Sequence, residues 1–410
     1  MVTRYVAITL IAVAAGLCAC DVGLPYTGEP PGTPRSPTPE NGAKGIATDA
    51  MLGWLCEPSG TGGALIYDVY LGTENPPPRV AESVTVNSYD PGGLFPGAAY
   101  YWKIAAYDED GRVTEGPIWH FDTMSGLWTR VDSPTSANLN GVAFTDTGEG
   151  WAVGDAGTIL RYDGISWVIV PWSIVSDLNG IALSGNDGWA VGASGTVLRL
   201  SGGAWTDVSP GITSDLYAVD LAADGTGWFG GDGGTAYRLV SGTWTPENIS
   251  DTVNIYCVAV YDSDNVWAGG LLNGLYEWGA EGWSEVVVPP YDPIPINAAY
   301  RGAAVYAENG PAVWAGGYGV YFANFVGGEW TFGMPPAPSS INGIHIKDGA
   351  GYGWAAGDDG TLAFYDGGSW YQYGEGGISG DLNDVFTIDK DEAWAVGDGG
   401  EIYRFEPVVR

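Results

Sequence analysis

Four aspartates recur at one position of a repeated pattern, each four residues after a tryptophan: Asp155, Asp232, Asp358 and Asp398. A ring of carboxylates could attract Ca²⁺ or a basic partner. In Asp-x-Gly turns, however, the aspartate commonly accepts hydrogen bonds from backbone N–H groups, and this structural interpretation is favoured. The equivalent positions of other repeats hold Ala193, Leu271 and Tyr318, and the chain has no EF-hand-like loop. We therefore expect no metal site and no cofactor, with Ca²⁺ binding as the minor alternative.

Side chains suited to catalysis are sparse. The chain has two histidines, His120 and His345, so a serine or cysteine nucleophile has few candidate partners. Arginines recur at one strand position, which favours pairing with surface acids over a catalytic arginine cluster: Arg161, Arg199, Arg238 and Arg404. Paired carboxylates for glycoside hydrolysis remain open, because acidic residues are numerous. We expect a protein that is not an enzyme and has no catalytic residues.

One irregular segment is a candidate for specificity. The segment 289–295 interrupts the repeated pattern and contains Tyr291 and Asp292 among four prolines. Loops that break a repeat are often the ones that bind a ligand. A tolerated insertion without function is the competing interpretation. Tyr291 and Asp292 therefore join the four aspartates as candidate ligand-binding residues.

The composition bounds the partners. The chain has 410 residues, with 49 Asp and Glu against 15 Lys and Arg, and a net charge of −34. A charge this negative repels phosphates and argues against a nucleic-acid partner. The length predicts more than one domain. The 66 glycines, 19 tryptophans and 24 tyrosines favour an all-β protein rich in turns.

The N-terminus has the pattern of an export signal over residues 1–20. An apolar stretch from Tyr5 to Leu17 is too short to span a bilayer and is followed by Cys20. The segment ending at Cys20 resembles a bacterial lipobox, which implies lipidation of Cys20 and anchoring in the cell envelope, periplasmic or surface-exposed. A plain secretory signal, giving a secreted protein, is the alternative. Residues 21–40 hold six prolines and predict an extended linker.

Residues 41–124 carry short alternating strands separated by turns. The stretch from Leu94 to Tyr100 is similar to the tyrosine corner of a sandwich domain. The whole segment resembles a bacterial fibronectin type III domain, and the resemblance implies a seven-strand sandwich used as a spacer or adhesive module.

Residues 127–407 form a repeat. Two tryptophan series of seven members each mark it: Trp151, Trp189, Trp228, Trp267, Trp314, Trp354 and Trp394, and Trp128, Trp167, Trp205, Trp244, Trp283, Trp330 and Trp370. Four strand-like pieces per ~40 residues are typical of one propeller blade, so we predict a seven-bladed β-propeller with its tryptophans in the core. The last unit lacks a fourth strand, while Trp128–Val131 is a spare one. Pairing of the two would close the ring in the manner of Velcro and remove an exposed edge.

The repeats resemble those of the photosystem II assembly and stability factor family and, more loosely, sialidase-like BNR/Asp-box repeats. The residues that carry this resemblance lie in the stretches 150–167 and 353–370. The first likeness implies an assembly factor for a membrane protein complex, and the second a propeller glycoside hydrolase or lyase. We favour a monomeric, non-catalytic binding or scaffold module for a protein or glycan ligand, attached to the membrane by its lipid.

Overall fold

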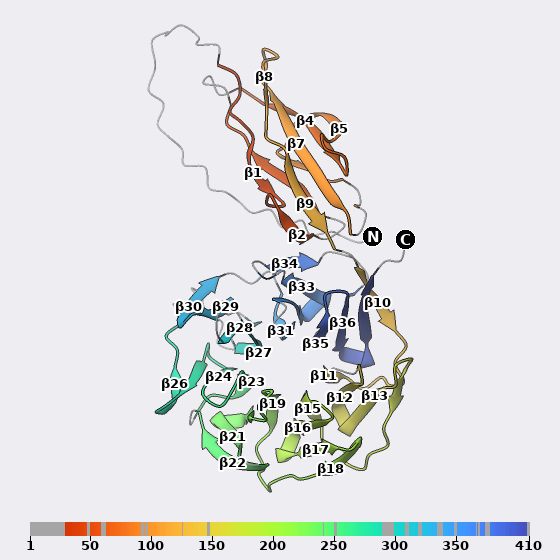
Figure 1. Cartoon of the computed structure of the whole chain (residues 1–410), viewed down its shortest axis with the longest axis vertical. Helices are drawn as coiled ribbons and strands as arrows, with labels where there is room; N and C mark the ends of the chain where they lie inside the picture. The colour runs from red at the N-terminus through yellow and green to blue at the C-terminus, as the bar shows by residue number, and fades with distance from the viewer. Residues whose placement is uncertain are drawn as a thin grey trace.

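The computed structural model describes residues 29–407 except for short internal segments: 47–49, 59–62, 92–93, 95–96, 125, 146–147, 241, 250–251, 289–298, 308–310, 319–321, 334–338, 348–350, 366, 368–369 and 374–377. Cys20, Tyr291 and Asp292 therefore lie outside the described residues. The described part consists of strands and short 3-10 turns, so the expectation of an all-β chain is confirmed (Figure 1). Within it, no helix is long and apolar enough to cross a membrane.

The N-terminal part of the described chain is a β-sandwich. One sheet has the order β1 (Arg35–Thr38), β3 (Leu52–Leu55) and β6 (Ser88–Tyr89). The other has the order β2 (Ala43–Ile46), β9 (Trp119–Thr123), β7 (Ala99–Tyr107), β4 (Ile66–Gly72) and β5 (Arg79–Val84), with β8 (Val113–Glu115) also paired to β7. Inward-facing aromatic rings, including Trp54 and Trp102, fill the space between the sheets because alternate strand residues point to one face.

Strand β1 lies inside the segment that the sequence assigned to the linker. It pairs with β3, and the N–H of Gly32 donates to the carbonyl of Glu57. Proline lacks the N–H that a central strand needs, but β1 is an edge strand, where Pro37 is tolerated. A proline-rich stretch can thus form the border of a sandwich as well as a spacer.

Seven four-stranded antiparallel sheets follow within the described residues and surround a central space (Figure 1). In order from the centre outwards, the first six are β11 (Leu139–Phe144), β12 (Gly150–Gly154), β13 (Thr158–Tyr162), β14 (Trp167–Ile169); β15 (Leu178–Ser184), β16 (Asp187–Gly192), β17 (Val197–Ser201), β18 (Ala204–Asp207); β19 (Leu216–Leu221), β20 (Gly227–Gly231), β21 (Thr235–Val240), β22 (Thr243–Asn248); β23 (Ile255–Val260), β24 (Val266–Gly270), β25 (Leu275–Gly279), β26 (Gly282–Glu285); β27 (Ala299–Ala307), β28 (Pro311–Tyr318), β29 (Phe322–Val326), β30 (Glu329–Gly333); and β31 (Ile341–Lys347), β32 (Tyr352–Gly357), β33 (Thr361–Tyr365), β34 (Trp370–Tyr373).

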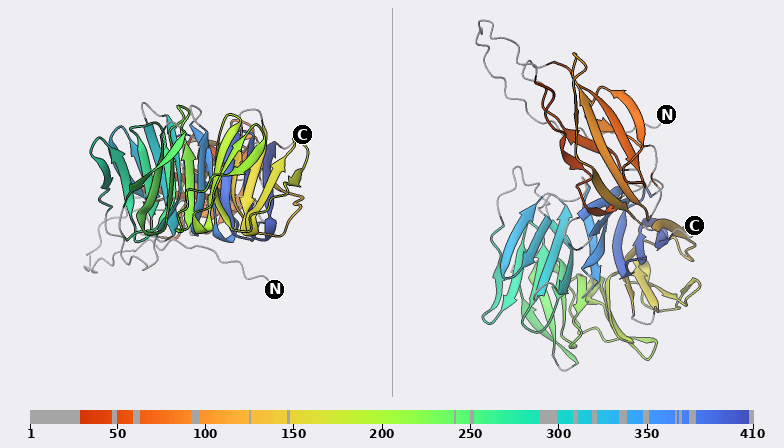
Figure 2. Two further views of the ribbon diagram at one scale, coloured as in Figure 1. Left: turned by 90° about the horizontal axis from the view of Figure 1, so that it is seen from below. Right: turned by 45° about the horizontal axis from the view of Figure 1, so that its top comes forward.

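The seventh sheet joins both ends of the repeat region. Its order is β35 (Leu382–Asp389), β36 (Glu392–Gly397), β37 (Ile402–Pro407) and β10 (Gly126–Val131). Strand β10 pairs with β37 from Gly126 opposite Pro407 to Val131 opposite Ile402, so the predicted closing pair is present. Neighbouring inner strands contact one another around the whole ring, including β35 with β11. From the side the ring is a short cylinder whose strands run between two faces (Figure 2).

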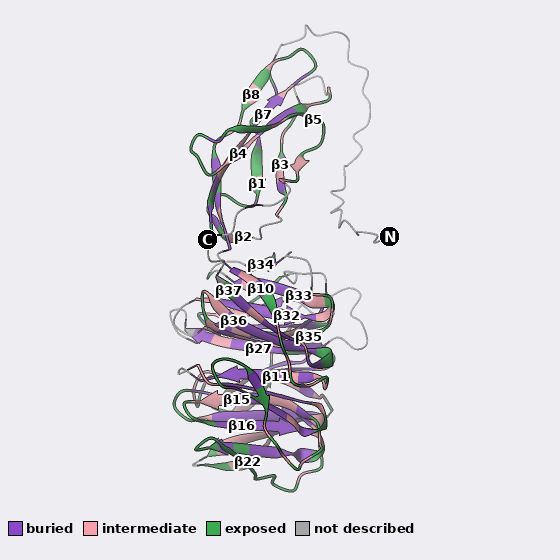
Figure 3. Cartoon of the chain, turned by 90° about the vertical axis from the view of Figure 1, so that its right-hand side faces the viewer, coloured by how far each residue is buried: buried purple, intermediate pink, exposed green. Residues whose placement is uncertain are grey.

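The alternation of large and small residues explains how the sheets stack. In β12, Trp151 and Val153 pack against the β15–β18 sheet, while Ala152 faces the seventh sheet and its Trp394. Trp151 is 1 % exposed and meets Trp205 edge-on, with ring centroids 5.5 Å apart. Burial of this kind recurs around the ring, in keeping with the predicted core role of the repeated tryptophans (Figure 3).

The glycine at or next to the end of each second strand has a steric cause. A Cβ at any of these positions would lie only 1.8–2.2 Å from a backbone carbonyl oxygen that precedes or begins the inner strand: Gly154, Gly192, Gly231, Gly270, Gly317, Gly357 and Gly397. Such a distance is far inside van der Waals contact, so only glycine allows the two chain segments to approach. In five of the seven sheets a 3-10 turn follows directly, and it thereby reaches the start of the inner strand.

The sandwich contacts the ring at the sixth sheet. Strand β2 lies against β34, and Tyr371 of β34 packs on the hydrophobic core of the sandwich. Gly45 of β2 has a φ of +65°, and a Cβ there would come within 2.5 Å of the Phe364 ring. The close approach of these two elements therefore requires glycine at this position.

Candidate functional site

A channel of about 1160 Å³ runs through the ring and is lined by its inner strands. Every inner strand has a register irregularity near its start, between Leu139 and Gly141 in β11 for example. Bulges of this kind re-aim one side chain out of the regular alternation. The residues at the irregularities all line the channel: Asn140, Asn179, Tyr217, Tyr256, Arg301, Asn342 and Asn383. We call this set the bulge ring.

The asparagines of the bulge ring connect neighbouring sheets. The Nδ2 group of Asn140 donates to Asp155 Oδ1 and to the carbonyl of Leu178 in the next inner strand, both at 3.0 Å. Asn342 and Asn383 repeat both contacts in their own sheets, and Asn179 repeats the second. The amide groups are thus used in holding the ring together, which leaves them few hydrogen bonds to offer a ligand.

The four candidate aspartates lie on the face that carries the 3-10 turns, here called the turn face. Asp155, Asp358 and Asp398 accept from the bulge-ring asparagines, and Asp232 accepts from the Tyr217 hydroxyl at 2.8 Å. Each of these turns also contains a left-handed residue whose N–H donates to an Asp or Asn before the next inner strand: Ala156 to Asp177, Gly233 to Asn254, Asp359 to Asp381 and Gly399 to Asn138. The structure therefore gives the candidate aspartates a structural use, and among the described residues no group of three or more metal-binding side chains gathers.

Three neighbouring members of the bulge ring depart from asparagine. Tyr217 and Tyr256 have ring centroids 5.0 Å apart at an interplanar angle of 54°. Burial and the hydrogen bond to Asp232 raise the pKa of Tyr217, so its hydroxyl stays protonated. Arg301 is exposed, and its Nη1 lies 3.5 Å from Asn342 Oδ1. The sequence interpretation missed these three residues, although alignment of the repeats on Asn140 would have found them.

Further along the channel lining, partly buried acceptors bridge neighbouring inner strands. Asp384 accepts from the N–H of Val142 and Asp220 from that of Val260. Desolvation raises the pKa of both carboxyl groups to about 7, against the opposing effect of these hydrogen bonds. His345 Nδ1 accepts from the N–H of Thr387, and burial lowers the pKa of this imidazole to about 3. All three side chains hold backbone groups, an arrangement unlike that of a general acid or base poised over a substrate.

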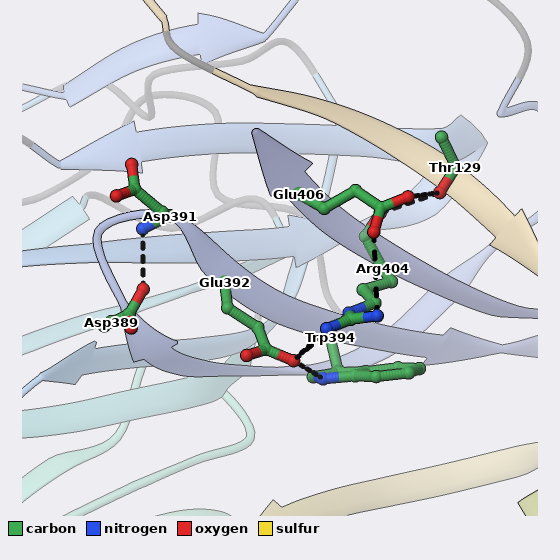
Figure 4. A network of polar contacts seen from close by, with 7 residues as sticks. All are labelled: Thr129, Asp389, Asp391, Glu392, Trp394, Arg404 and Glu406. Carbon is green, nitrogen blue, oxygen red and sulfur yellow. Dashed lines mark hydrogen bonds and ion pairs between the residues drawn. The ribbon is translucent and has the colours of Figure 1, made fainter. Parts of the chain in front are cut away.

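The recurring arginines lie on the sheets, away from the bulge ring. Arg161 pairs with Glu149 at 2.7 Å, and Arg238 with Glu247 at 3.6 Å. Arg404 lies between Glu392 and Glu406, and Glu392 also accepts from the Trp394 indole (Figure 4). The guanidinium groups also stand over repeat tryptophans at 5.2–5.9 Å from the ring centroids. These three arginines therefore pair with acidic residues, as predicted.

Comparison with known proteins identifies the fold of the ring. No family model and no curated protein matches the chain. Among solved structures, YCF48 bound to a D1 peptide is similar at a TM-score of 0.53 and 17% identity, covering 68% of this chain and 97% of that one. A streptogramin B lyase is similar at a TM-score of 0.59 and 15% identity, covering 69% of this chain and 98% of that one. The WD40 β-propeller domain of Doa1 is similar at a TM-score of 0.55 and 12% identity, covering 68% of this chain and 97% of that one. At these identities the likeness shows the fold, a β-propeller.

Proposed function

We propose that this chain is a non-catalytic binding module that holds a segment of another protein on the turn face of a seven-bladed propeller. The observation that carries the proposal is the asymmetry of the bulge ring. Four positions hold asparagines that are used in the structure, whereas Tyr217, Tyr256 and Arg301 offer aromatic surface and a guanidinium group at the channel mouth. Aromatic residues and arginine are enriched where proteins bind one another. The peptide named in the YCF48 structure supports a protein segment as the ligand class.

The rest of the chain is proposed to present this face outside the cytoplasm. In this proposal residues 1–20 are a lipoprotein signal, Cys20 carries the lipid, and the sandwich is a fibronectin type III module that spaces the ring from the membrane. The protein then acts as a monomer in a bacterial cell envelope. If the partner is a subunit of a membrane complex, the same binding would make the protein an assembly factor.

A face-specific crosslink tests the proposal. Val175 lies in the loop between β14 and β15 on the turn face and is 80% exposed, while Ile165 lies in the turn between β13 and β14 on the opposite face and is 89% exposed. A photo-crosslinking amino acid at each position, in the full chain expressed in its host envelope, should give a discrete protein adduct from position 175 and none from position 165. Adducts of equal yield from both positions, or none from position 175, would refute binding on the turn face.

A lyase is the second candidate, favoured by the similarity to the streptogramin B lyase. It is the weaker one, because the titratable groups of the channel, Asp220, His345 and Asp384, all hold backbone N–H groups. Turnover of a streptogramin or of a polysaccharide by the purified chain, abolished by Asp384→Asn in a folded variant, would establish the enzyme instead.

A further inference from the structure

Arg301 differs in its surroundings from three recurring arginines of the ring. Arg161, Arg238 and Arg404 each have a glutamate partner and stand over a tryptophan. Among the described residues, the polar side-chain contact of Arg301 is the long one to Asn342 Oδ1, and that amide is itself bound to Asp358 and to a backbone carbonyl. A guanidinium group has five N–H donors in a planar fork, so most of its bonding capacity points to the channel mouth.

Tyr217 and Tyr256 share this part of the channel lining with Arg301. They belong to β19 and β23, and Arg301 to the next inner strand, β27, so the three side chains occupy consecutive places around the channel (Figure 1). The Tyr217 hydroxyl is held by Asp232, which fixes the orientation of its ring. The Tyr256 ring packs against it at a tilt and presents apolar surface toward the channel. A rigid aromatic pair next to a guanidinium group suits a ligand with a carboxylate beside an apolar group.

We propose that Tyr217, Tyr256 and Arg301 form a subsite that binds one carboxylate of the partner segment, with the neighbouring apolar side chain of that segment on the tyrosine rings. This inference rests on the proposed function and deepens it. A sugar is the poorer fit, because it needs several hydrogen bonds per ring and the amides of the flanking Asn179 and Asn342 are already used. A polyanion is also a poor fit, because the turn face carries Asp155, Asp232, Asp358 and Asp398. The site therefore selects a single carboxylate in an otherwise neutral or basic peptide.

Small probes test the subsite directly. N-acetylphenylalanine offers a chain-terminal carboxylate next to an aromatic group, and the dipeptide N-acetylphenylalanyl-aspartic acid α-amide offers a side-chain carboxylate. N-acetylphenylalaninamide is the neutral control. Binding to the purified full chain is measured by isothermal titration and by perturbation of NMR signals. For ligands of this size we expect a dissociation constant of about 1 mM for at least one carboxylate probe and affinity about tenfold lower for the neutral one.

Four variants distinguish a specific effect of the Arg301 guanidinium group on binding from a general effect of net charge. Arg301→Gln should lower the affinity for the carboxylate probe about tenfold. Arg301→Lys should lower this affinity less, because the positive charge remains although the planar fork of donors is lost. Tyr256→Leu should lower the affinity for the same probe about threefold, because the contact with the aromatic ring is lost. Arg199→Gln makes the same change of net charge at an exposed residue of β17 outside the channel lining and should leave binding unchanged.

The outcomes are decisive in each direction. Equal affinity of the acid and amide probes, an Arg301→Gln variant that binds like the wild type, or no saturation by either carboxylate probe up to about 20 mM would overturn the subsite. The crosslink from position 175 then remains as a separate readout. If Arg301→Gln leaves that adduct unchanged, the subsite fails and the proposed function stands. If the probes bind through Arg301 but no adduct forms, the subsite stands and the proposed function fails.

Discussion

Replacement of Trp128 by alanine tests whether the ring is held closed by its two chain ends. Trp128 is 8% exposed and packs against Trp354 and Phe405, with ring centroids 5.1 and 5.7 Å away. A buried tryptophan covers about 150–250 Å², which at about 25 cal/mol per Å² corresponds to roughly 4–6 kcal/mol. Measured replacements of buried aromatic residues by alanine cost about 3–5 kcal/mol, so we expect a loss in that range for Trp128→Ala.

The matched control is Trp205→Ala. Trp205 occupies the corresponding place in the outer strand β18, is 5% exposed, and meets Trp151 edge-on. Its strand is joined to β17 by a short hairpin, so the cavity should destabilise the fold without detaching the strand. Strand β10 pairs with a partner 275 residues away, as in the contact of Thr129 with Arg404, and has no such tether. Trp128→Ala should therefore also release β10 from β37.

Urea unfolding measures the loss of stability, and hydrogen exchange under native conditions measures the release. We expect similar losses of unfolding free energy for the two variants, but faster exchange of the amides in β10 and β37 in Trp128→Ala alone. A loss below about 1 kcal/mol in Trp128→Ala would refute the packing argument. Equal protection of β10 in both variants would refute the view that this tryptophan keeps the ring closed.

Three further predictions concern stability. Burial raises the pKa of Asp220 and Asp384 to about 7. Between about pH 4 and 7 the folded chain therefore binds more protons than the unfolded chain, and the free energy of unfolding should fall as pH rises. The fall is at most about 1.4 kcal/mol per pH unit for each carboxyl group. Urea midpoints across this range check the slope, which Asp384→Asn should reduce. Gly357→Ala should destabilise the fold by about 3 kcal/mol or more, because its Cβ would lie 1.8 Å from the carbonyl oxygen of Ser340. The control Gly333→Ala has open space around the new Cβ and should cost under about 0.5 kcal/mol. Thermal melting measures both losses. Saturating Ca²⁺ should raise the melting temperature by less than about 1 °C, because the turn-face carboxylates already accept hydrogen bonds; a larger rise would show a calcium site.

Features that depend on strand periodicity could be predicted, and features that depend on departures from it could not. The alternation around Trp151 predicted both the strand and its packing, since each residue's face follows from the period of two. The bulge at Asn140 breaks that period by one residue, which no alternation pattern reveals. Asp155 was recognised from the sequence as a recurring residue, and Asn140 is its partner in the structure. Their hydrogen bond joins the inner strand to a turn 15 residues later and is visible only in three dimensions.

The departures from the repeat gather on one side of the ring. If the bulge ring served stability alone, asparagine would suit every position, because its amide donates both to the turn and to the next inner strand, as Asn383 does. The substitutions instead fall in three consecutive inner strands, β19, β23 and β27, and the segment 289–298, which breaks the repeat spacing, immediately precedes β27 in the chain. Their adjacency gives the ring one contiguous stretch of channel lining that differs from the asparagine positions. The opposite half of the ring, with Asn342, Asn383 and Asn140, supplies the rigid frame against which that stretch is held.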